Sequence, residues 1–292
     1  AGRTAAPFLQ RAMGAQAAGM GTAFAAVQYS ADSLQYNPSA IGTLKEKTIT
    51  SSYLKGLGGM SHGYFGYIHP SSLGAFAASL LYFNAGTISL NLSDGTRRLA
   101  TSEKNLAYTL TYGRHLVSGL HVGATYRFVQ LELAETARAT TSQTDFGFLW
   151  RTPLKGFSLG GAYQFLGPDI TYESVGDPPP KTLRYGVAFR FPDLDPTKID
   201  PSVDLEEFDL TLAVDGVKTL YEKHSPRAGM EIGLRPPSAG RVALRTGWII
   251  GRKAEGLTLG LGFRQGIISF DYAFGAAAEL GHLQHFTISA SF

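Results

Sequence analysis

The sequence contains no cysteine among its 292 residues. A chain without thiols forms no disulfide, has no cysteine nucleophile, binds no metal through sulfur and offers no amino-terminal cysteine for lipid attachment. This composition is compatible with an oxidising compartment without requiring one. We expect neither a cofactor nor a metal site.

Long hydrophobic runs are also missing. The longest nearly apolar stretch, residues 74–83, is about half the roughly 20 residues that a transmembrane helix needs. The hydrophobic content of 44% and the mean hydropathy of -0.02 are too low for a helical membrane protein. A β-barrel escapes this test, because its strands need only about 9 to 11 residues with apolar side chains at alternate positions.

Three further features are absent. Lysine and arginine are scattered singly despite the net charge of +3, so we expect no nucleic-acid partner. No Pro-rich or Ser/Gly-rich hinge divides the chain, which favours one large domain. No basic and apolar leader opens the sequence, so either the chain never carried a signal peptide or Ala1 is the residue that follows its cleavage.

A two-residue alternation of apolar and polar side chains runs through most of the sequence. In 183–191, for example, Leu183, Tyr185 and Val187 alternate with Arg184 and Gly186. The pattern predicts strands at 46–55, 61–69, 73–84, 104–115, 119–135, 142–152, 156–166, 182–191, 206–216, 226–235, 240–250, 256–265, 267–275 and 283–292. The even count of about 14 is typical of bacterial single-chain barrels.

The last predicted strand places Phe286, Ile288, Ala290 and Phe292 on one face. In this respect it resembles the closing strand of outer-membrane barrels, whose terminal Phe is part of an assembly signal. An edge strand of a soluble sandwich is the alternative. Some 14 strands of large apolar residues would overfill a sandwich core but suit a lipid-facing band. The sequence shows no fixed repeat period that would indicate a solenoid or a propeller.

Connection lengths agree with a barrel if the first strand runs outward. The inner turns at 69–72, 115–119, 152–156, 236–240 and 265–266 are short, and the outer loops at 84–104, after Val129 and at 167–181 are long. The inner connection 192–205 is an exception, which indicates a missed strand or an inner partner. The alternation also slips between Phe128 and Val129, which a bulge or emergence from the membrane would explain.

Residues 1–43 show no alternation and are rich in alanine and glycine. Residues 8–42 resemble the amino-terminal segment of the PorV/PorQ family, through Gly19, Met20 and Gly21 and through Asn37 and Pro38, and residues 270–292 resemble that family's last hairpin. The family belongs to the FadL-type 14-stranded outer-membrane barrels. The resemblance implies a plug at 1–43 inside a transmembrane barrel at 44–292.

In FadL-type proteins the Asn-Pro motif lies in this plug, so the resemblance implies that Asn37 and Pro38 anchor it. Alternatively they make the turn into the first strand. Phe8, Met20 and Phe24 are the candidate plug residues lining a lumen or binding site. The chain is short for the extended outer loops with which FadL transporters capture fatty acids.

Three patterns that suggest chemistry are weaker. Residues 59–63 fit the G-x-S-x-G nucleophile elbow, but strand-like sequence follows Ser61 where that motif needs a helix. His282 and His285 fall on opposite faces of a strand. The acidic residues of 193–207 lack the glycine and ligand spacing of an EF-hand. We therefore expect no enzyme.

The sequence thus predicts an all-β protein, a transmembrane antiparallel outer-membrane β-barrel of a Gram-negative-type bacterium. Its expected partners are outer-membrane lipid and, as the resemblance to PorV implies, envelope or secretion proteins for which it is a membrane-embedded partner. The alternative is a transporter for small hydrophobic ligands such as fatty acids, and an outer-membrane hydrolase is a remote third hypothesis.

Overall fold

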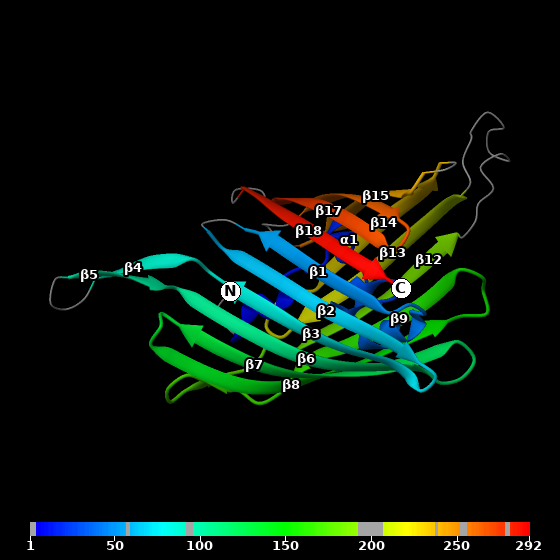
Figure 1. Cartoon of the computed structure of the whole chain (residues 1–292). Coiled ribbons are helices and arrows are strands. Elements are labelled where there is room, and N and C mark those ends of the chain that lie inside the picture. The colour runs from blue at the N-terminus through cyan, green and yellow to red at the C-terminus, as the bar shows by residue number, and fades with distance from the viewer. Residues whose placement is uncertain are drawn as a thin grey trace.

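The computed structural model describes residues 4–56, 59–91, 96–191, 207–236, 239–251, 256–277 and 281–292. In these residues, fourteen strands form one closed antiparallel barrel (Figure 1). The strands are β1 (Thr48–Lys55), β2 (Ser61–Ser71), β3 (Gly74–Asn84), β6 (Glu103–His115), β7 (Leu120–Leu133), β8 (Ala137–Arg151), β9 (Phe157–Leu166), β12 (Thr182–Phe191), β13 (Glu207–Thr219), β14 (Ser225–Arg235), β15 (Arg241–Ile249), β16 (Leu257–Gln265), β17 (Ile268–Ala277) and β18 (Gly281–Ser291). This confirms the predicted fold class and, within a few residues at most ends, the predicted strands.

The barrel closes between its first and last strands. Thr48 of β1 pairs with Ser291 of β18, and the Lys47 and Phe292 backbones donate hydrogen bonds to each other, 3.0 and 2.9 Å long. Since every strand of the barrel has two neighbours, the barrel has no free edge. A two-sheet sandwich is therefore excluded.

The alternation divides the strands into an outer and an inner face. On β12 the side chains of Leu183 and Tyr185 are 46% and 48% exposed, whereas Arg184 between them is 6% exposed. The outward-facing aliphatic and aromatic side chains form the lipid-contacting surface. Polar and charged side chains such as Arg184 face the lumen, where many of them are buried.

Short turns join the strands at the inner end: 72–73, 116–119, 152–156 and 266–267. The outer end carries two small hairpins that the alternation did not predict. β4 (Thr87–Asn91) pairs with β5 (Arg97–Thr101) between β3 and β6, and β10 (Ile170–Thr171) pairs with β11 (Gly176–Asp177) between β9 and β12. Figure 1 shows the first hairpin projecting beyond the barrel.

One prediction about β7 was wrong, and one of the two explanations offered for its slip in alternation is excluded. No long loop follows Val129, because β7 continues to Leu133 and a turn at 134–136 leads directly into β8. The slip in the alternation is not a bulge, since β7 keeps one register with both neighbours. Val129 and Leu131 face inward and pack in the core, and Gln130 faces outward, as expected where a strand leaves the bilayer.

The connection at 192–205, including most of the acidic residues considered for calcium, lies outside the described residues. Ser61 begins β2, so a strand and not a helix follows it. None of the helices in the described ranges is long and apolar enough to cross a membrane.

Candidate functional site

The amino-terminal residues 4–43, which we call the luminal segment, lie inside the barrel (Figure 1). The segment forms four short helices: η1 (Pro7–Gln10), α1 (Ala15–Gly19), η2 (Ala31–Gln35) and η3 (Pro38–Thr43). α1 contacts β15 to β18, and η3 contacts β3, β6, β7 and β8 on the other side of the barrel. The predicted division of the chain after residue 43 stays an interpretation.

Asn37 both caps a helix and binds the wall. Its side-chain oxygen accepts hydrogen bonds from the amide and hydroxyl of Ser39, 3.1 and 2.7 Å away, which starts η3. Its Nδ2 donates to the carbonyl oxygens of Ala25 (2.6 Å) and Phe148 of β8 (2.9 Å). One fully buried side chain therefore both caps η3 and hydrogen-bonds to the wall.

Glycines in the wall give the luminal segment room. A Cβ added to Gly123 of β7 or Gly147 of β8 would lie 2.5 Å from the Pro38 carbonyl carbon or 2.2 Å from Asn37 Oδ1. Across the barrel, a Cβ on Gly247 of β15 would lie 2.0 Å from the Gly21 amide nitrogen. Only glycine, which has no Cβ, permits this approach. The wall glycines therefore allow the luminal segment to pack directly against the strands.

Buried wall side chains hydrogen-bond the backbone of the luminal segment. Asp215 Oδ2 accepts from the amides of Phe24 (2.7 Å) and Ala25 (2.8 Å). Thr258 Oγ1 accepts from the Gly21 amide and donates to the Gly19 carbonyl, 3.0 and 3.1 Å away. These contacts pair backbone polar groups at and beyond the carboxyl end of α1 with the wall.

Asp32 of η2 is buried against α1 and the residue before it. Its Oδ2 accepts from the Ala17 amide at 3.0 Å, and a Cβ on Gly14 would lie 2.1 Å from its Cγ. Burial, which disfavours the charged carboxylate, raises the pKa of Asp32 to about 7. Asp32 is therefore the group of the luminal segment whose charge changes near neutral pH.

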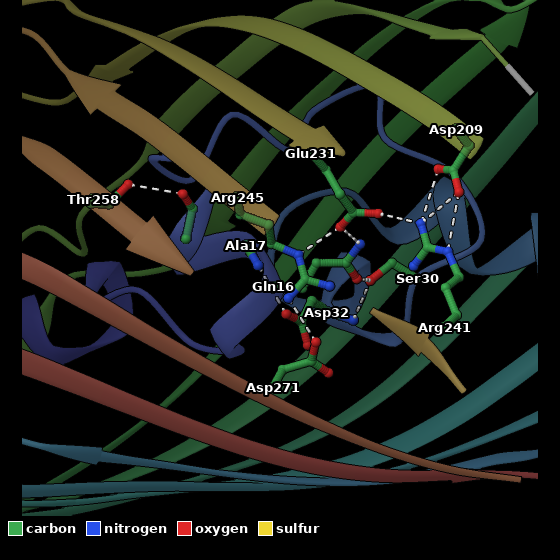
Figure 2. Close-up of polar contacts among 11 residues, drawn as sticks. Gln16, Ala17, Ser30, Asp32, Asp209, Glu231, Arg241, Arg245, Thr258 and Asp271 are labelled. Carbon is green, nitrogen blue, oxygen red and sulfur yellow. Dashed lines mark hydrogen bonds and ion pairs between the residues drawn. The ribbon is translucent and has the colours of Figure 1, made fainter. Parts of the chain in front are cut away.

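Figure 2 shows a network of charges between α1 and the wall. Gln16 Nε2 donates to Glu231 Oε2 of β14 at 2.8 Å, and Arg245 Nε of β15 donates to the same oxygen at 2.6 Å. Arg245 Nη1 also donates to Asp271 of β17 at 2.7 Å. Arg241 bridges Glu231 and Asp209, with its Nη2 3.0 and 2.9 Å from their carboxylates.

A second buried ion pair joins β7 and β8. Arg127 donates to both oxygens of Asp145 at 3.1 and 2.8 Å, and their side chains are 3% and 1% exposed. Asp145 also accepts from the Phe165 amide at 2.7 Å, at the point where the β8–β9 register shifts.

The structure does not gather the predicted plug residues at one site. Phe8 is buried on Phe83, with ring centroids 5.7 Å apart, whereas Met20 and Phe24 belong to a different cluster with Tyr36. Asn37 and Pro38 lie against β7 and β8. Glu231 and Arg245 fall on the predicted strands 226–235 and 240–250 but were not among the predicted site residues. Their signal was a charge at an inward position of a predicted strand.

A cavity of about 420 Å³ opens beside the charge network at the inner end, and we call it the inner cavity. It is bordered by Gln16, Met20 and Tyr29 of the luminal segment and by wall residues including Arg190, Thr211, Arg241, Arg245 and Ser269. Two cavities on the outer side of the segment measure only about 50 and 20 Å³.

Comparison with known proteins gave a family and a set of similar folds. A family model described as Type IX secretion system protein PorV matches residues 1–211. No curated protein matches the chain.

Three solved structures illustrate the fold. The toluene transporter TodX of Pseudomonas putida has a TM-score of 0.62 and 10% identity, with 96% of this chain and 98% of that chain covered. The CymD monoaromatic hydrocarbon channel has a TM-score of 0.59, 11% identity and coverage of 96% and 97%. A FadL homologue of Pseudomonas aeruginosa has a TM-score of 0.50 and 9% identity, with 96% of this chain and 98% of that chain covered. At these identities the likeness is one of fold.

Proposed function

This chain belongs to the PorV family of outer-membrane barrels, and we propose that it acts as a membrane-embedded partner in type IX protein secretion and surface assembly. The luminal segment is its plug in this proposal, with Asn37 and Pro38 as the anchor. No catalytic step is part of the proposed role.

The observation that carries this proposal is the filled outer half of the lumen. Phe8 and Met13 are each at most 1% exposed and belong to one core with Val129 and Leu131 of the wall. The two outer cavities, about 50 and 20 Å³, are smaller than the roughly 150 Å³ that holds benzene in an engineered protein cavity. An outer lumen filled in this way favours a partner over a conduit.

Co-purification tests the proposal. The full chain is extracted from its native membrane in a mild neutral detergent, and bound proteins are identified by crosslinking and mass spectrometry. An unrelated barrel from the same membrane, extracted in parallel, is the control. We expect envelope or secreted proteins that are enriched with this chain and not with the control barrel.

Transport of small hydrophobic molecules is the competing outcome. It requires the luminal segment to leave its wall contacts, because Phe8 and Phe24 of the segment are buried inside the barrel. Isolation of the chain alone, with a lipid-like molecule in the barrel and uptake of a labelled fatty acid or toluene restored in cells that lack their own channel, would replace the secretion proposal with transport.

A further inference from the structure

We propose that the inner cavity binds a small phosphate-bearing anion, with Arg190 as its principal charge contact. The cavity volume of about 420 Å³ lies in the range of small-molecule sites. The site lies at the short-turn end of the barrel and is separate from the filled outer lumen.

Arg190 is a cation that the described residues leave uncompensated. Its Nε is buried without a hydrogen-bond partner, and within the described part of the chain no carboxylate lies within ion-pair distance of its guanidinium. The guanidinium instead lies over the Tyr29 ring, 5.7 Å from its centroid. A partly desolvated cation without a counterion is costly, and a bound anion would offset that cost.

Three acids around the cavity are already engaged by other arginines, and the fourth, Asp32, accepts a hydrogen bond from the Ala17 amide. Glu231 binds Arg241 and Arg245, and Asp271 binds Arg245 at 2.7 Å. Glu46 pairs with Arg264 at 3.0 Å. Among the described residues, these pairs leave Arg190 without a carboxylate partner.

Tyr29 positions the Arg190 guanidinium beside the inner cavity. Its backbone has a φ of 59°, a left-handed conformation that a tyrosine rarely adopts. In that conformation its ring lies under Arg190 and its hydroxyl accepts a hydrogen bond from Arg151 Nη1 at 3.0 Å. The fold thus maintains an unusual backbone geometry where two cationic side chains converge on one ring.

The polar lining favours phosphate over carboxylate. Thr211 is the cross-strand neighbour of Arg190, and both it and Ser269 border the cavity. A phosphate group presents at least three strong acceptor oxygens, which a guanidinium and several hydroxyl donors satisfy together, whereas one guanidinium satisfies both carboxylate oxygens.

The test measures binding to the full-length protein in neutral detergent by isothermal titration calorimetry. The probes are inorganic phosphate, glycerol 3-phosphate and, as the carboxylate comparison, acetate. We expect saturable binding of a phosphate probe and at least about tenfold weaker binding of acetate. In Arg190→Gln we expect the Kd for phosphate to rise at least about tenfold, and in Arg190→Lys less, because lysine keeps the charge without the planar fork.

Arg97→Gln is the matched control, since Arg97 is exposed on β5 at the opposite end of the barrel and loses the same charge. The Kd of the Arg97→Gln variant for phosphate should stay within about twofold of the wild-type value. Heat-modifiable mobility on gels confirms that each variant is folded. Equal phosphate affinity in Arg190→Gln and Arg97→Gln would overturn the assignment, as would acetate binding as tightly as phosphate.

A second arm separates a free phosphate from a lipid head group. The protein is reconstituted in nanodiscs of phosphatidylglycerol or phosphatidylcholine, and retained lipid is counted by native mass spectrometry. Lipid retention lost in Arg190→Gln identifies a head group as the source, and calorimetric binding alone identifies a soluble phosphate. The proposal fails if neither arm detects binding. Because no secretion partner is present, this failure is distinct from failure of the proposed secretion role.

Discussion

Gly123 of β7 lies so close to Pro38 of the luminal segment that a Cβ on Gly123 would stand 2.5 Å from the Pro38 carbonyl carbon. The contact is between backbones, so no side-chain rotation relieves it. Wall and segment therefore fit only if this wall position is glycine.

Gly123→Ala should displace η3 from β7 without opening the barrel, since the strand itself can hold alanine. We expect faster amide hydrogen exchange in residues 36–43 and unchanged exchange in the strands far from η3. Gly63→Ala on β2 is the control, because a Cβ there meets nothing within 4 Å. Equal exchange of residues 36–43 in both variants would show that the close approach is not needed.

Asn37→Asp should loosen the luminal segment although it changes only the amide. The carboxylate still accepts from Ser39, but it cannot donate to the Phe148 and Ala25 carbonyls. Each buried acceptor left unsatisfied lowers the free energy of unfolding by up to about 3 kcal/mol. Limited proteolysis of the segment in detergent measures the effect, and Ser39→Ala, which removes one donor to Asn37, should be milder. A variant as resistant as wild type would contradict the anchoring role.

The stability of the protein should fall as pH rises from about 4 to 7, through Asp32. Its folded-state pKa of about 7 exceeds the ordinary value of 3.8, so in this window the folded protein keeps a proton that the unfolded chain has lost. The contribution is present in full below pH 4 and is lost above pH 7, with a size on the order of 4 kcal/mol.

Asp32→Asn should remove this part of the pH dependence, because the amide oxygen still accepts from Ala17. Thermal melts at pH 5 and pH 8 test it, with Asp169→Asn as the exposed control. An unchanged difference between the two melting temperatures in Asp32→Asn would refute the assignment.

Asp145→Ala should cost about 3–5 kcal/mol of unfolding free energy, because it leaves the Arg127 guanidinium buried without its partner. Urea unfolding in lipid vesicles provides the measurement. In the double variant Arg127→Met with Asp145→Ala, the cost should be smaller than the sum of the single costs.

The exposed pair Arg98–Glu135 serves as the control for this double-mutant cycle of Arg127 and Asp145. The side chains are 60% and 33% exposed, and removing either should change stability by only about 0–1 kcal/mol. Additive costs in the Arg127–Asp145 cycle would mean that the buried pair contributes no coupling.

The candidate site was only partly predictable. Asn37 and Pro38 were identified through the family resemblance, and the structure assigns Asn37 bonds to both η3 and β8. Asp215 and Thr258 were not identified, although both fall on predicted strands. A charge or hydroxyl at an inward position signals a polar lumen, but it does not reveal which backbone amide it meets.

The sequence by itself determined the barrel: its strands, their inward and outward faces and their order. Apart from the closure of β1 on β18, these features are local, because each barrel strand pairs with the barrel strands next to it in the chain and alternation has a period of two. Only the tertiary structure decided how residues 4–43 fill that barrel. Phe24 meets Asp215 across 191 positions, a contact set by the shapes of wall and segment and carried by no periodic pattern. The inner cavity with Arg190 follows from the same non-local packing, since it is the space that the segment leaves at the inner end.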